Sequence, residues 1–532
     1  KQTIIDNTGA VWTRFGNELR RTDGKNTESL IIPKQFSKSL LNLFFRDRSG
    51  AYWLALDDVI NGYTVRFQNG KADILSNKEG LPSGIVNAIF EDSKRNIWFG
   101  SKSEGGLSIY QNGKFQNLTK KDGLSSDGFS SFSEDREGGV WGASFDGGLV
   151  RLSPQIIKSF AEKDGLSGKG VYPLFEDNRG TIWIGDWANT KGLNKYEDGK
   201  LSTVSGGGLY TSIFADRDGV LWLGSYNQIG KIENGKYSVT FSLPQIATSA
   251  IIQDKNGTIW FGSGDGLRRM KSNSQQSNPV NIIPNPPELF DYFTTKEGLP
   301  AGDVKVLHFD RNGTLWIGTA GGLAKMSEPS RLVGELNITA FTEKDGLSGN
   351  HVRSIYEDSG GVLWFGTFDN GLTRLKDGKF SAIRVKDGLF DQGVFQILED
   401  DSGRFWISSN RGIYRVNKQE LNDFADGKTQ KINSVGYGVK DGMADAECNG
   451  GTSPAGFKSK KDGTLWFPTQ KGVAIVDPKS LPVNNSPPNV VIEKCLLDRQ
   501  AVDCRDIKIL PENDSLEIQF TGLSFNKPDQ IK

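Results

Sequence analysis

Apart from a recurring aspartate, few residues in this sequence could do chemistry. The 532 residues include two histidines, His308 and His351, and three cysteines, Cys448, Cys495 and Cys504. Two histidines leave little material for a Ser-His-Asp triad, and with scattered cysteines they give no zinc-ligand spacing. The sequence also lacks a G-x-x-x-x-G-K-[ST] phosphate loop. We therefore expect no catalytic residues, no metal and no cofactor, and the chain is predicted not to be an enzyme.

The cysteines carry one hint about the compartment. Cys495 and Cys504 are nine residues apart near the C-terminus, whereas Cys448 stands alone. A local disulfide between the first two would fit an oxidising compartment. Two unpaired thiols in a small sheet are the alternative, and the sequence leaves both open.

The recurring aspartate belongs to an internal repeat with the pattern D-x-x-G-x-x-W. The spacing of the copies is mostly 38 to 48 residues, with longer steps of 56 and 60. Two copies depart from the pattern, because Arg95 replaces the glycine in one and Lys460 replaces the aspartate in the other. The tryptophans of the eleven copies are Trp12, Trp53, Trp98, Trp141, Trp183, Trp222, Trp260, Trp316, Trp364, Trp406 and Trp466.

Each part of the repeat has a mechanical interpretation. A short apolar run before the aspartate, such as 86–90 or 351–356, predicts a strand. Aspartate followed three residues later by glycine suits a tight turn, because the carboxylate accepts local backbone N–H groups. The tryptophan lies in a second strand, and its size suits packing against a neighbouring unit. A glycine-rich loop, a third strand such as 371–375, a D-G-K-F turn and a fourth strand follow.

Four short strands in about 40 residues, repeated along the chain, are typical of the blades of a β-propeller. The predicted fold class is therefore all-β, with eleven four-stranded blade repeats in tandem propellers. Radial closure would bury both faces of each blade, so the repeated tryptophans need no functional explanation. The K-D-G-L segments at 121–124, 163–166, 344–347 and 386–389 are predicted to be turns between blades.

The charge balance argues against one common class of partner. Lysine and arginine together number 64, as do aspartate and glutamate, so the formal net charge is zero. A nucleic-acid binder usually has a basic excess or stripe, and we expect no nucleic-acid partner. No stretch approaches the roughly 18 apolar residues of a membrane-spanning helix. The chain begins with Lys1 rather than Met, which suggests a piece of a longer protein.

The repeat resembles that of the two-component regulator propeller, most clearly over residues 344–380. That family occurs in the extracytoplasmic sensor region of bacterial hybrid two-component systems. The resemblance covers residues 1–480. After Pro482, the linker at 484–493 and the alternating apolar and polar run at 515–525 resemble the opening of the triple-tyrosine β-sandwich that follows such propellers.

The resemblance also implies seven-bladed rings. Counting back seven blades from Trp466 predicts a partial first propeller of about four blades at 1–152 and a complete second propeller at 153–481. The start of the β-sandwich linker domain would then occupy 482–532. The rival division breaks the chain at the proline-rich segment 275–290, which would leave only four blades behind it. On the preferred division, we interpret 271–290 as an insertion between blades.

Other functions stay open at this stage. The turn faintly resembles the Asp-box of sialidases and other glycoside hydrolases, which are propellers too. In that box tryptophan follows glycine by four residues, whereas here it follows by three. Glycoside hydrolysis needs two carboxylates at a defined separation, whereas the acids here recur in turns. A glycan-cleaving hydrolase or lyase is one alternative, and a protein-interaction scaffold with a large exposed apolar patch is another.

The two histidines occupy different places in the repeat. His308 stands in a strand where other copies have Phe, Ile, Leu or Tyr, and we expect it in the core. His351 begins the first strand of its blade, where it would face the open end of the ring. It is either a ligand contact or an ordinary residue at the start of a strand.

The loops between the second and third strands vary most between copies, and variation on a constant scaffold suits recognition. Trp187 is the one tryptophan outside the repeat register, and it suits either stacking on a sugar face or packing on its own blade. The candidate ligand-binding residues are Trp187, Tyr226, Asn227, Asp265, His351, Arg353, Phe368, Asp369, Asn410 and Arg411.

The resemblance implies a non-catalytic, ligand-binding sensor module in the periplasm, as part of an inner-membrane receptor. It implies an oligosaccharide or other small extracellular ligand, a homodimer, and a membrane-linked kinase outside this chain. Ligand binding would bias the packing of the two subunits, which requires that the ligand prefers one arrangement over the other.

Overall fold

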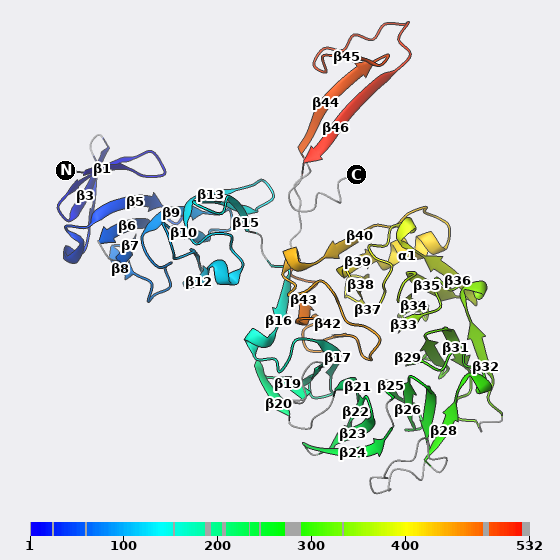
Figure 1. Cartoon of the computed structure of the whole chain (residues 1–532). Helices are drawn as coiled ribbons and strands as arrows, with labels where there is room; N and C mark the ends of the chain where they lie inside the picture. Colours follow the sequence, from blue (N-terminus) through cyan, green and yellow to red (C-terminus); the bar gives the residue numbers. More distant parts are fainter. Residues whose placement is uncertain are drawn as a thin grey trace. The chain divides into compact units, whose positions relative to one another are not determined.

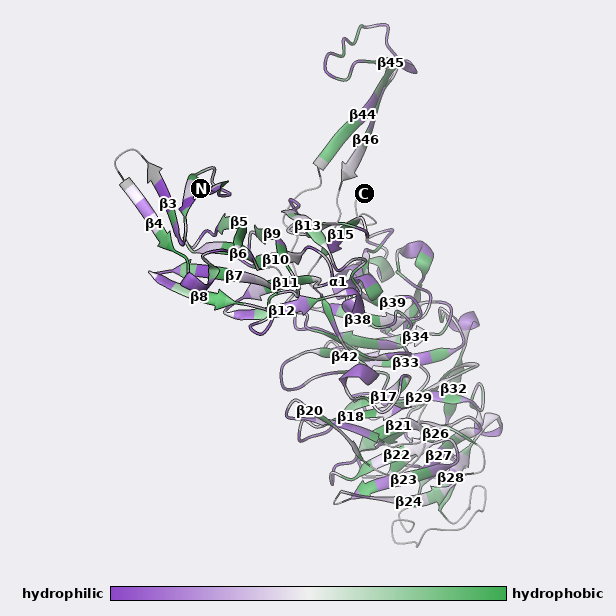
Figure 2. Ribbon diagram, turned by 60° about the vertical axis from the view of Figure 1, so that its left-hand side comes forward, coloured by the Kyte–Doolittle hydropathy of each residue, from purple (hydrophilic) through white to green (hydrophobic). Residues whose placement is uncertain are grey.

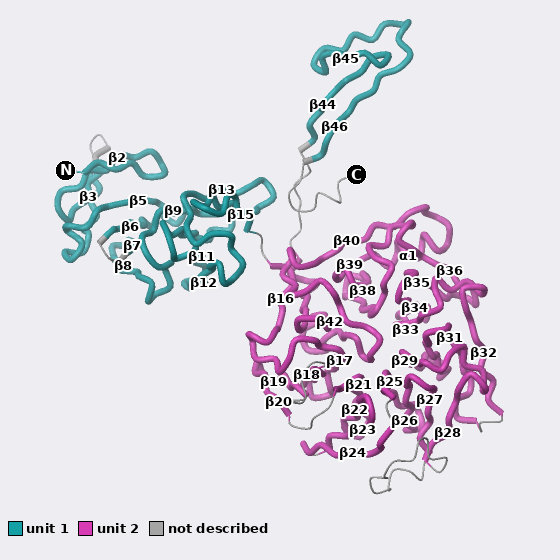
Figure 3. Tube along the Cα trace, in the orientation of Figure 1, with its two compact units in different colours: residues 1–154, 483–532 teal, residues 155–482 magenta. Residues whose placement is uncertain are grey.

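The computed structural model consists almost entirely of antiparallel β-sheets (Figure 1). It describes residues 2–23, 26–58, 61–152, 155–186, 193–204, 209–233, 235–243, 246–271, 289–331, 335–481 and 489–523. The chain divides into two compact units, one of residues 1–154 with 483–532 and one of residues 155–482 (Figure 3). The predicted fold class is confirmed, whereas the predicted division at 152 and 481 stays a prediction.

The described residues of the second unit form seven four-stranded sheets, which lie around a ring (Figure 1). We call each sheet a blade. One α-helix is described in this unit, α1 (Lys418–Ala425). The strands of the unit are β16 (Ile157–Phe160), β17 (Val171–Glu176), β18 (Ile182–Asp186), β19 (Leu193–Glu197), β20 (Lys200–Val204), β21 (Tyr210–Ala215), β22 (Leu221–Ser225), β23 (Gln228–Glu233), β24 (Lys236–Ser242), β25 (Thr248–Gln253), β26 (Ile259–Ser263), β27 (Gly266–Met270), β28 (Phe290–Phe293), β29 (Val304–Phe309), β30 (Leu315–Thr319), β31 (Gly322–Met326), β32 (Ile338–Phe341), β33 (Val352–Glu357), β34 (Leu363–Thr367), β35 (Leu372–Lys376), β36 (Lys379–Ile383), β37 (Gln396–Glu399), β38 (Arg404–Ser409), β39 (Gly412–Asn417), β40 (Ser434–Tyr437), β41 (Phe457–Lys458), β42 (Leu465–Thr469) and β43 (Gly472–Val476).

Six of these blades are built from consecutive strands, whereas the seventh closes the ring. Its sheet order is β16-β43-β42-β41, so the first strand of the unit pairs with one of the last. The antiparallel register runs from Ile157 opposite Val476 to Phe160 opposite Val473. The two ends of the unit are therefore held together by backbone hydrogen bonds within one sheet.

The repeated aspartate joins each turn to its tryptophan. Asp358 Oδ1 accepts the backbone N–H groups of Gly360 and Val362 at 2.9 and 3.1 Å. Its Oδ2 accepts the indole Nε1–H of Trp364 at 3.2 Å. The same indole bond occurs in ten of the eleven copies, at 2.8–3.2 Å. The predicted bonding of the carboxylate to the local backbone is confirmed, and the bond to the indole is an addition to it.

The tryptophans pack between neighbouring blades, as predicted. Trp364 is fully buried and meets Phe405 of the next blade edge-on, with ring centroids 5.1 Å apart. At the ring closure, Trp466 packs on Phe160 of β16 in its own blade and on Tyr196 of the neighbouring β17–β20 blade. Truncating such a buried indole to alanine costs about 3–5 kcal/mol, so these contacts are a main source of cohesion between blades.

The two departures from the repeat have local solutions. Arg95, in the place of the glycine, adopts a left-handed backbone with φ of 67°. In the copy with Lys460, the turn is one residue longer, since the Gly463 N–H donates to the carbonyl of Ser459 at 3.0 Å. There the hydroxyl of Thr464 accepts the indole N–H of Trp466 at 2.9 Å in place of a carboxylate.

The K-D-G-L segments form single 3₁₀ turns between blades, as predicted. Asp345 Oδ2 accepts the backbone N–H of Thr342 at 2.8 Å, and Gly346 follows with φ of 109°. These turns are η2 (Lys120–Asp122), η3 (Glu162–Asp164), η7 (Glu343–Asp345) and η8 (Val385–Asp387), and η5 (Thr295–Glu297) and η9 (Val439–Asp441) repeat the arrangement.

The long insertion lies within a blade, not between blades as predicted. The strands on either side of it, β27 and β28, pair with each other in one sheet, from Leu267 opposite Phe293 to Met270 opposite Phe290. The segment 271–289 therefore connects the third and fourth strands of that blade. The predicted place of the insertion between blades is therefore wrong, because strand pairing spans it.

The first unit contains three four-stranded sheets and one three-stranded sheet of the repeat, among its described residues. The strands of these four sheets are β1 (Gln2–Ile5), β2 (Val11–Phe15), β3 (Glu18–Asp23), β4 (Asn26–Ile31), β5 (Leu40–Arg46), β6 (Tyr52–Asp58), β7 (Asn61–Gln68), β8 (Lys71–Leu75), β9 (Val86–Glu91), β10 (Ile97–Ser101), β11 (Leu107–Gln111), β12 (Lys114–Leu118), β13 (Phe129–Glu134), β14 (Val140–Ser144) and β15 (Leu149–Leu152). The 3₁₀ turn η1 (Lys34–Phe36) precedes β5. The turn and tryptophan geometry is that of the second unit.

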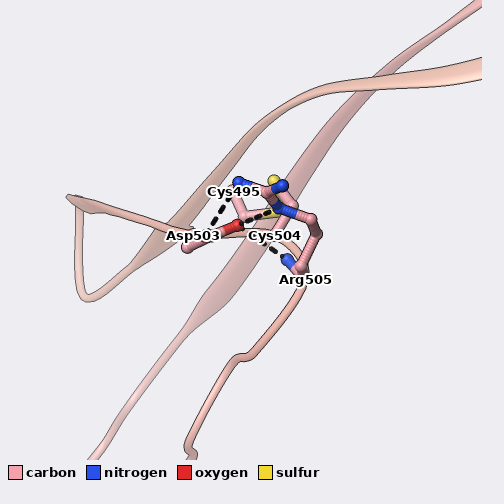
Figure 4. Close-up of a disulfide and its surroundings, with 4 residues drawn as sticks. All are labelled: Cys495, Asp503, Cys504 and Arg505. Atoms are coloured by element: carbon pink, nitrogen blue, oxygen red, sulfur yellow. Dashed lines mark hydrogen bonds and ion pairs between the residues drawn. A yellow bond between two sulfur atoms is a disulfide. The ribbon is translucent and has the colours of Figure 1, made fainter.

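The C-terminal segment forms a separate three-stranded sheet of β44 (Asn489–Leu497), β45 (Gln500–Val502) and β46 (Leu516–Leu523). Cys495 and Cys504 form a disulfide with their Cα atoms 5.4 Å apart (Figure 4). Of the two alternatives for these cysteines, the structure has the disulfide. The run at 515–525 contains a strand, as predicted, but its apolar residues are exposed rather than half-buried, with Phe520 64% exposed.

Apolar residues concentrate in the strands of the repeat, such as β5 and β6 in Figure 2. The second strand of each complete blade is the most buried, and all five residues of β34 are buried. None of the helices in the described part of the chain is long and apolar enough to cross a membrane.

Candidate functional site

One end of the ring brings four of the predicted site residues together. At this end the first strand of a blade begins and the second strand ends, so His351 before β33 lies beside the loop after β34. The backbone N–H of Phe368 in that loop donates to the carbonyl of His351 at 2.9 Å. The two rings lie with centroids 5.3 Å apart. Arg353 and the exposed Asp369 belong to the same strand and loop.

Arg353 is the centre of this group. Its guanidinium carbon lies 4.7 Å from the ring centroid of Phe368, a cation–π contact. Its Nε–H donates to His351 Nε2 at 3.1 Å, and its Nη1 donates to the carbonyl of Gly450 at 2.9 Å. Burial lowers the pKa of Arg353, while the nearby carboxylates of Asp303 and Asp369 act in the opposite direction. The guanidinium is therefore a partly desolvated cation at the end of the ring.

His351 is neutral in this arrangement. Burial, followed by the charges of Arg353 and Lys305, lowers the pKa of His351 to about 4. Because Nε2 accepts a hydrogen bond from Arg353, the proton of the neutral ring is on Nδ1. The imidazole thus orients the guanidinium and keeps one N–H donor of its own.

An aromatic surface completes the group. Phe368 stacks on Phe395, with ring centroids 5.8 Å apart and planes at 17°. Phe395 is buried just before β37 of the next blade, whereas Phe368 is 38% exposed. Phe368 thus packs on Phe395, has the guanidinium of Arg353 over its ring, and keeps part of its surface open to solvent. Partly exposed aromatic surface next to hydrogen-bond donors is suited to contact with a partly apolar ligand such as a sugar.

A segment of the last blade also contacts this group. We call residues 446–456 the central segment. Asn449 Nδ2 donates to the carbonyl of Val171 in β17 at 2.6 Å, and the backbone N–H of Ile213 in β21 donates to the carbonyl of Ser453 at 3.3 Å. Gly450 meets Arg353, as described above. The central segment therefore links the first strands of three blades.

The contact between Arg353 and the central segment depends on a glycine. Gly451 has φ of 89°, and a Cβ at this position would lie 1.9 Å from Arg353 Nη1. A side chain here would both strain the backbone and displace the guanidinium. The backbone of the central segment thus sets the position of Arg353.

The other candidate residues lie on other blades. Asp265 forms a two-bond ion pair with the buried Arg268, at 2.6 and 2.9 Å, which gives it a structural role. Arg411 lies over the ring of Phe390 at 4.9 Å within its own blade. Tyr226, Asn227 and Asn410 are exposed. Trp187 lies outside the described residues. A role in ligand binding stays a prediction for every one of the ten residues.

Several residues of the group were not predicted. Lys305 and Asp303 form an ion pair at 2.8 Å at the start of β29, and both act electrostatically on His351. Phe395 and Gly450 also come from other blades. The only signal in the sequence for the central segment is the step of 60 residues between Trp406 and Trp466, which leaves room for an irregular first strand in the last blade.

His308 is partly buried rather than enclosed in the core. Its Nε2 lies 3.7 Å from Glu357 Oε2, and its side chain is 28% exposed. Burial lowers the pKa of His308. The described residues contain no group of three His, Cys, Asp or Glu side chains arranged to hold a metal ion.

Two surface pockets lie at the other end of the blades, at the turns between first and second strands. One, of about 520 Å³, is in the first unit and is lined by Phe45, Arg46 and Phe90 among others. The other, of about 390 Å³, is in the second unit and is lined by Asp401, Lys458 and Lys479 among others. Lys458 and Lys479 both pair with Asp401, so this pocket is bounded by ordinary surface ion pairs.

Comparison with known proteins agrees with the fold. The family model described as the two component regulator propeller matches residues 80–103, 205–227, 242–265, 298–321 and 346–369. The extracellular domain of a hybrid two component system from B. thetaiotaomicron is 19% identical with a TM-score of 0.71, and the match covers 99% of this chain and 70% of that one. A second such domain from the same organism is 15% identical with a TM-score of 0.49, over 94% and 67% of the chains. No curated protein matches the sequence. The predicted resemblance is thus confirmed, since five segments of the chain match the two-component regulator propeller repeat.

Proposed function

We propose that this protein is an extracytoplasmic, ligand-binding sensor module of a two-component signalling receptor. The family of its repeats supports this function, and its fold is that of an extracellular domain of a hybrid two component system. The Cys495–Cys504 disulfide fits an oxidising compartment such as the periplasm.

The proposed ligand is an oligosaccharide, and its proposed site is the group around Arg353 and Phe368. The observation that carries this proposal is the exposed ring of Phe368, which is supported by Phe395 and flanked by the guanidinium of Arg353. Sugar rings present an apolar face to aromatic side chains and hydroxyl groups to polar ones, and this group offers both kinds of contact.

The proposed output lies outside this chain. Ligand binding would favour one packing of two copies of the protein, and a membrane-linked kinase would respond to that packing. Such a switch requires a ligand that binds one arrangement more tightly than the other. Sedimentation with and without ligand checks the expected homodimer.

The test of the ligand class is calorimetric titration of the protein with a panel of oligosaccharides. Phe368→Ala is expected to weaken the binding of a recognised oligosaccharide by about tenfold, the equivalent of ~1.4 kcal/mol. Phe145→Ala is the matched control, because Phe145 is an exposed aromatic in the corresponding loop of a blade in the first unit and is not among the candidate residues. Equal losses in both variants, or binding of peptides but of no glycan, would contradict the proposal.

We also propose that the module binds its ligand without cleaving it. Prolonged incubation of the protein with each recognised oligosaccharide, followed by chromatography of the products, is expected to return the ligand intact. Shortened products that disappear after a single Asp→Asn or Glu→Gln change would instead identify a glycan-cleaving enzyme.

A further inference from the structure

The buried arginines of the second unit are mostly neutralised by an aspartate. Arg268, which is 1% exposed, pairs with Asp265 at 2.6 Å, and the 5% exposed side chain of Arg374 pairs with Asp426 at 2.5 Å. Such pairing is expected, since burying a charge is costly unless it is paired and hydrogen-bonded. Arg353 departs from this rule. Among the described residues, no carboxylate oxygen lies within 4.0 Å of its guanidinium.

The hydrogen bonds of Arg353 do not make up for the missing carboxylate. A guanidinium has five N–H groups, and within the described residues only two of those of Arg353 donate, one to His351 and one to Gly450. Arg14 in the first unit shows the contrast. It also lacks a carboxylate, but it donates to four backbone carbonyls, those of Gly16, Phe36, Ser37 and Ser39. Arg353 therefore has unused donors as well as unpaired charge.

Neither of the two carboxylates that act electrostatically on Arg353 satisfies it. Asp303 is held by Lys305 at 2.8 Å. Asp369 is exposed, so solvent screens its attraction. The adjacent ring of His351 adds a further donor, because its Nε2 accepts from Arg353 and its Nδ1 carries the proton. Unused donors thus lie next to the exposed ring of Phe368.

The geometry points to an oxyanion-binding subsite at Arg353, which recognises a carboxylate or sulfate group on a saccharide whose ring packs against Phe368. This inference rests on the proposed oligosaccharide-sensing function and narrows its ligand to acidic saccharides. The planar fork of arginine binds both groups through two parallel hydrogen bonds, so the subsite chemistry is common to uronic acids and sulfated sugars.

The experiment uses calorimetric titration of the whole chain with three kinds of probe. These are oligomers of a uronic acid, a sulfated hexosamine disaccharide, and neutral hexose oligomers of the same length. We expect one of the two acidic probes to bind and the neutral oligomers to bind at least tenfold more weakly. The two acidic arms show whether the group is a carboxylate or a sulfate.

Arginine variants locate the effect. Arg353→Gln is expected to weaken binding of the acidic probe by about 30-fold, which is the usual scale for removing one partner of a partly buried charge pair. Arg353→Lys keeps the charge but loses the fork, and we expect a loss of about three- to tenfold. Arg179→Gln removes an exposed arginine at the opposite end of the ring and is expected to change affinity less than twofold.

The outcomes separate the two proposals. Neutral oligomers that bind as tightly as acidic ones, with Arg353→Gln unchanged, would overturn the subsite and leave the sensing function intact. Failure of every saccharide to bind would overturn the proposed oligosaccharide ligand, on which this inference rests. If Arg353→Gln does not fold, salt titration of the unmodified protein decides: raising NaCl should weaken an acidic probe bound at this subsite, and an affinity independent of salt would overturn the inference.

Discussion

The indole Nε1–H of Trp406 donates to Oδ2 of Asp400 over 2.8 Å, and both side chains are buried. The same carboxylate accepts the backbone N–H groups of Ser402 and Arg404 and the Nε–H of Arg404. One acid therefore serves four donors and fixes the tryptophan that packs against the next blade. The following residue, Asp401, is exposed and pairs with Lys458 and Lys479.

Asp400→Ala is expected to destabilise the ring by about 3 kcal/mol, because it leaves buried donors without acceptors. Asp401→Ala removes surface ion pairs and is expected to cost less than about 1 kcal/mol. Urea unfolding of the two adjacent variants, followed by tryptophan fluorescence, measures the difference. Equal losses would show that the aspartate is not the centre of the turn.

The ring closure can be tested at a glycine. Gly472 begins β43 with φ of 118°, and a Cβ there would lie 1.9 Å from the carbonyl oxygen of Phe160 in β16. Gly472→Ala is therefore expected to disrupt the pairing of the two strands and to cost at least about 3 kcal/mol. Gly378→Ala is the control, since Gly378 also has positive φ, 77°, but open space around it.

In Gly378→Ala we expect a loss of about 1 kcal/mol in the free energy of unfolding, from backbone strain alone. Limited proteolysis should then release the N-terminal part of the ring in Gly472→Ala but not in the control. If both variants unfold at the same urea concentration, the pairing of β16 with β43 does not hold the ring closed.

The lowered pKa of His351 predicts a pH dependence of stability. The folded-state pKa, about 4, is below the usual 6.5, so between these values the unfolded chain binds more protons than the folded one. The free energy of unfolding should therefore fall as pH is lowered from 6.5 towards 4. We expect His351 to lower the free energy of unfolding by about 1 kcal/mol over this range. This is less than the full pKa shift would give, because solvent screens a half-buried ring.

His351→Gln should lose this part of the slope. The comparison of the two proteins at pH 7 and pH 4.5 isolates the residue, because His308, whose pKa burial also lowers, is present in both. A slope that is the same in the variant and the parent would show that His351 does not titrate in this range.

The three cysteines are expected to differ in reactivity. Cys448 is buried, and burial raises the pKa of its thiol to about 12, so an alkylating reagent should not modify it in the folded protein. Cys495 and Cys504 should become reactive after reduction alone. Opening their short loop should cost the C-terminal sheet about 2–3 kcal/mol. Mass spectrometry after iodoacetamide treatment shows which cysteines are alkylated in the folded, the reduced and the unfolded protein. Alkylation of Cys448 before unfolding would contradict the prediction.

The parts of the fold that could be predicted from the sequence are those set by local interactions. The turn at Asp358 uses an acid, a glycine and a tryptophan within seven residues, and such a turn can be recognised in any copy. Repetition then predicts the blades and their burial. The insertion at 271–289 was placed wrongly, because the pairing of β27 with β28 depends on residues on either side of it that are far apart in sequence.

The candidate site also combines contacts that the sequence could predict with contacts that it could not. The proximity of His351, Arg353 and Phe368 follows from the register of one blade, and the sequence could predict it. Gly450 lies 97 residues from Arg353 and meets it only because the ring is closed. Asp265 looked like a free loop acid, since nothing in the sequence shows that Arg268 turns its buried side chain towards it.

The closing strand also sets an order of events during synthesis. Ser159 donates to the carbonyl of Gly442, 283 residues later in the chain. A ribosome adds roughly 5–20 residues per second, so β16 waits on the order of 15–60 s for its partners while six blades are made. During that interval an unpaired strand and the uncovered side of the first blade are available to other nascent chains. The open ring is therefore exposed to wrong strand pairing until its last blade emerges.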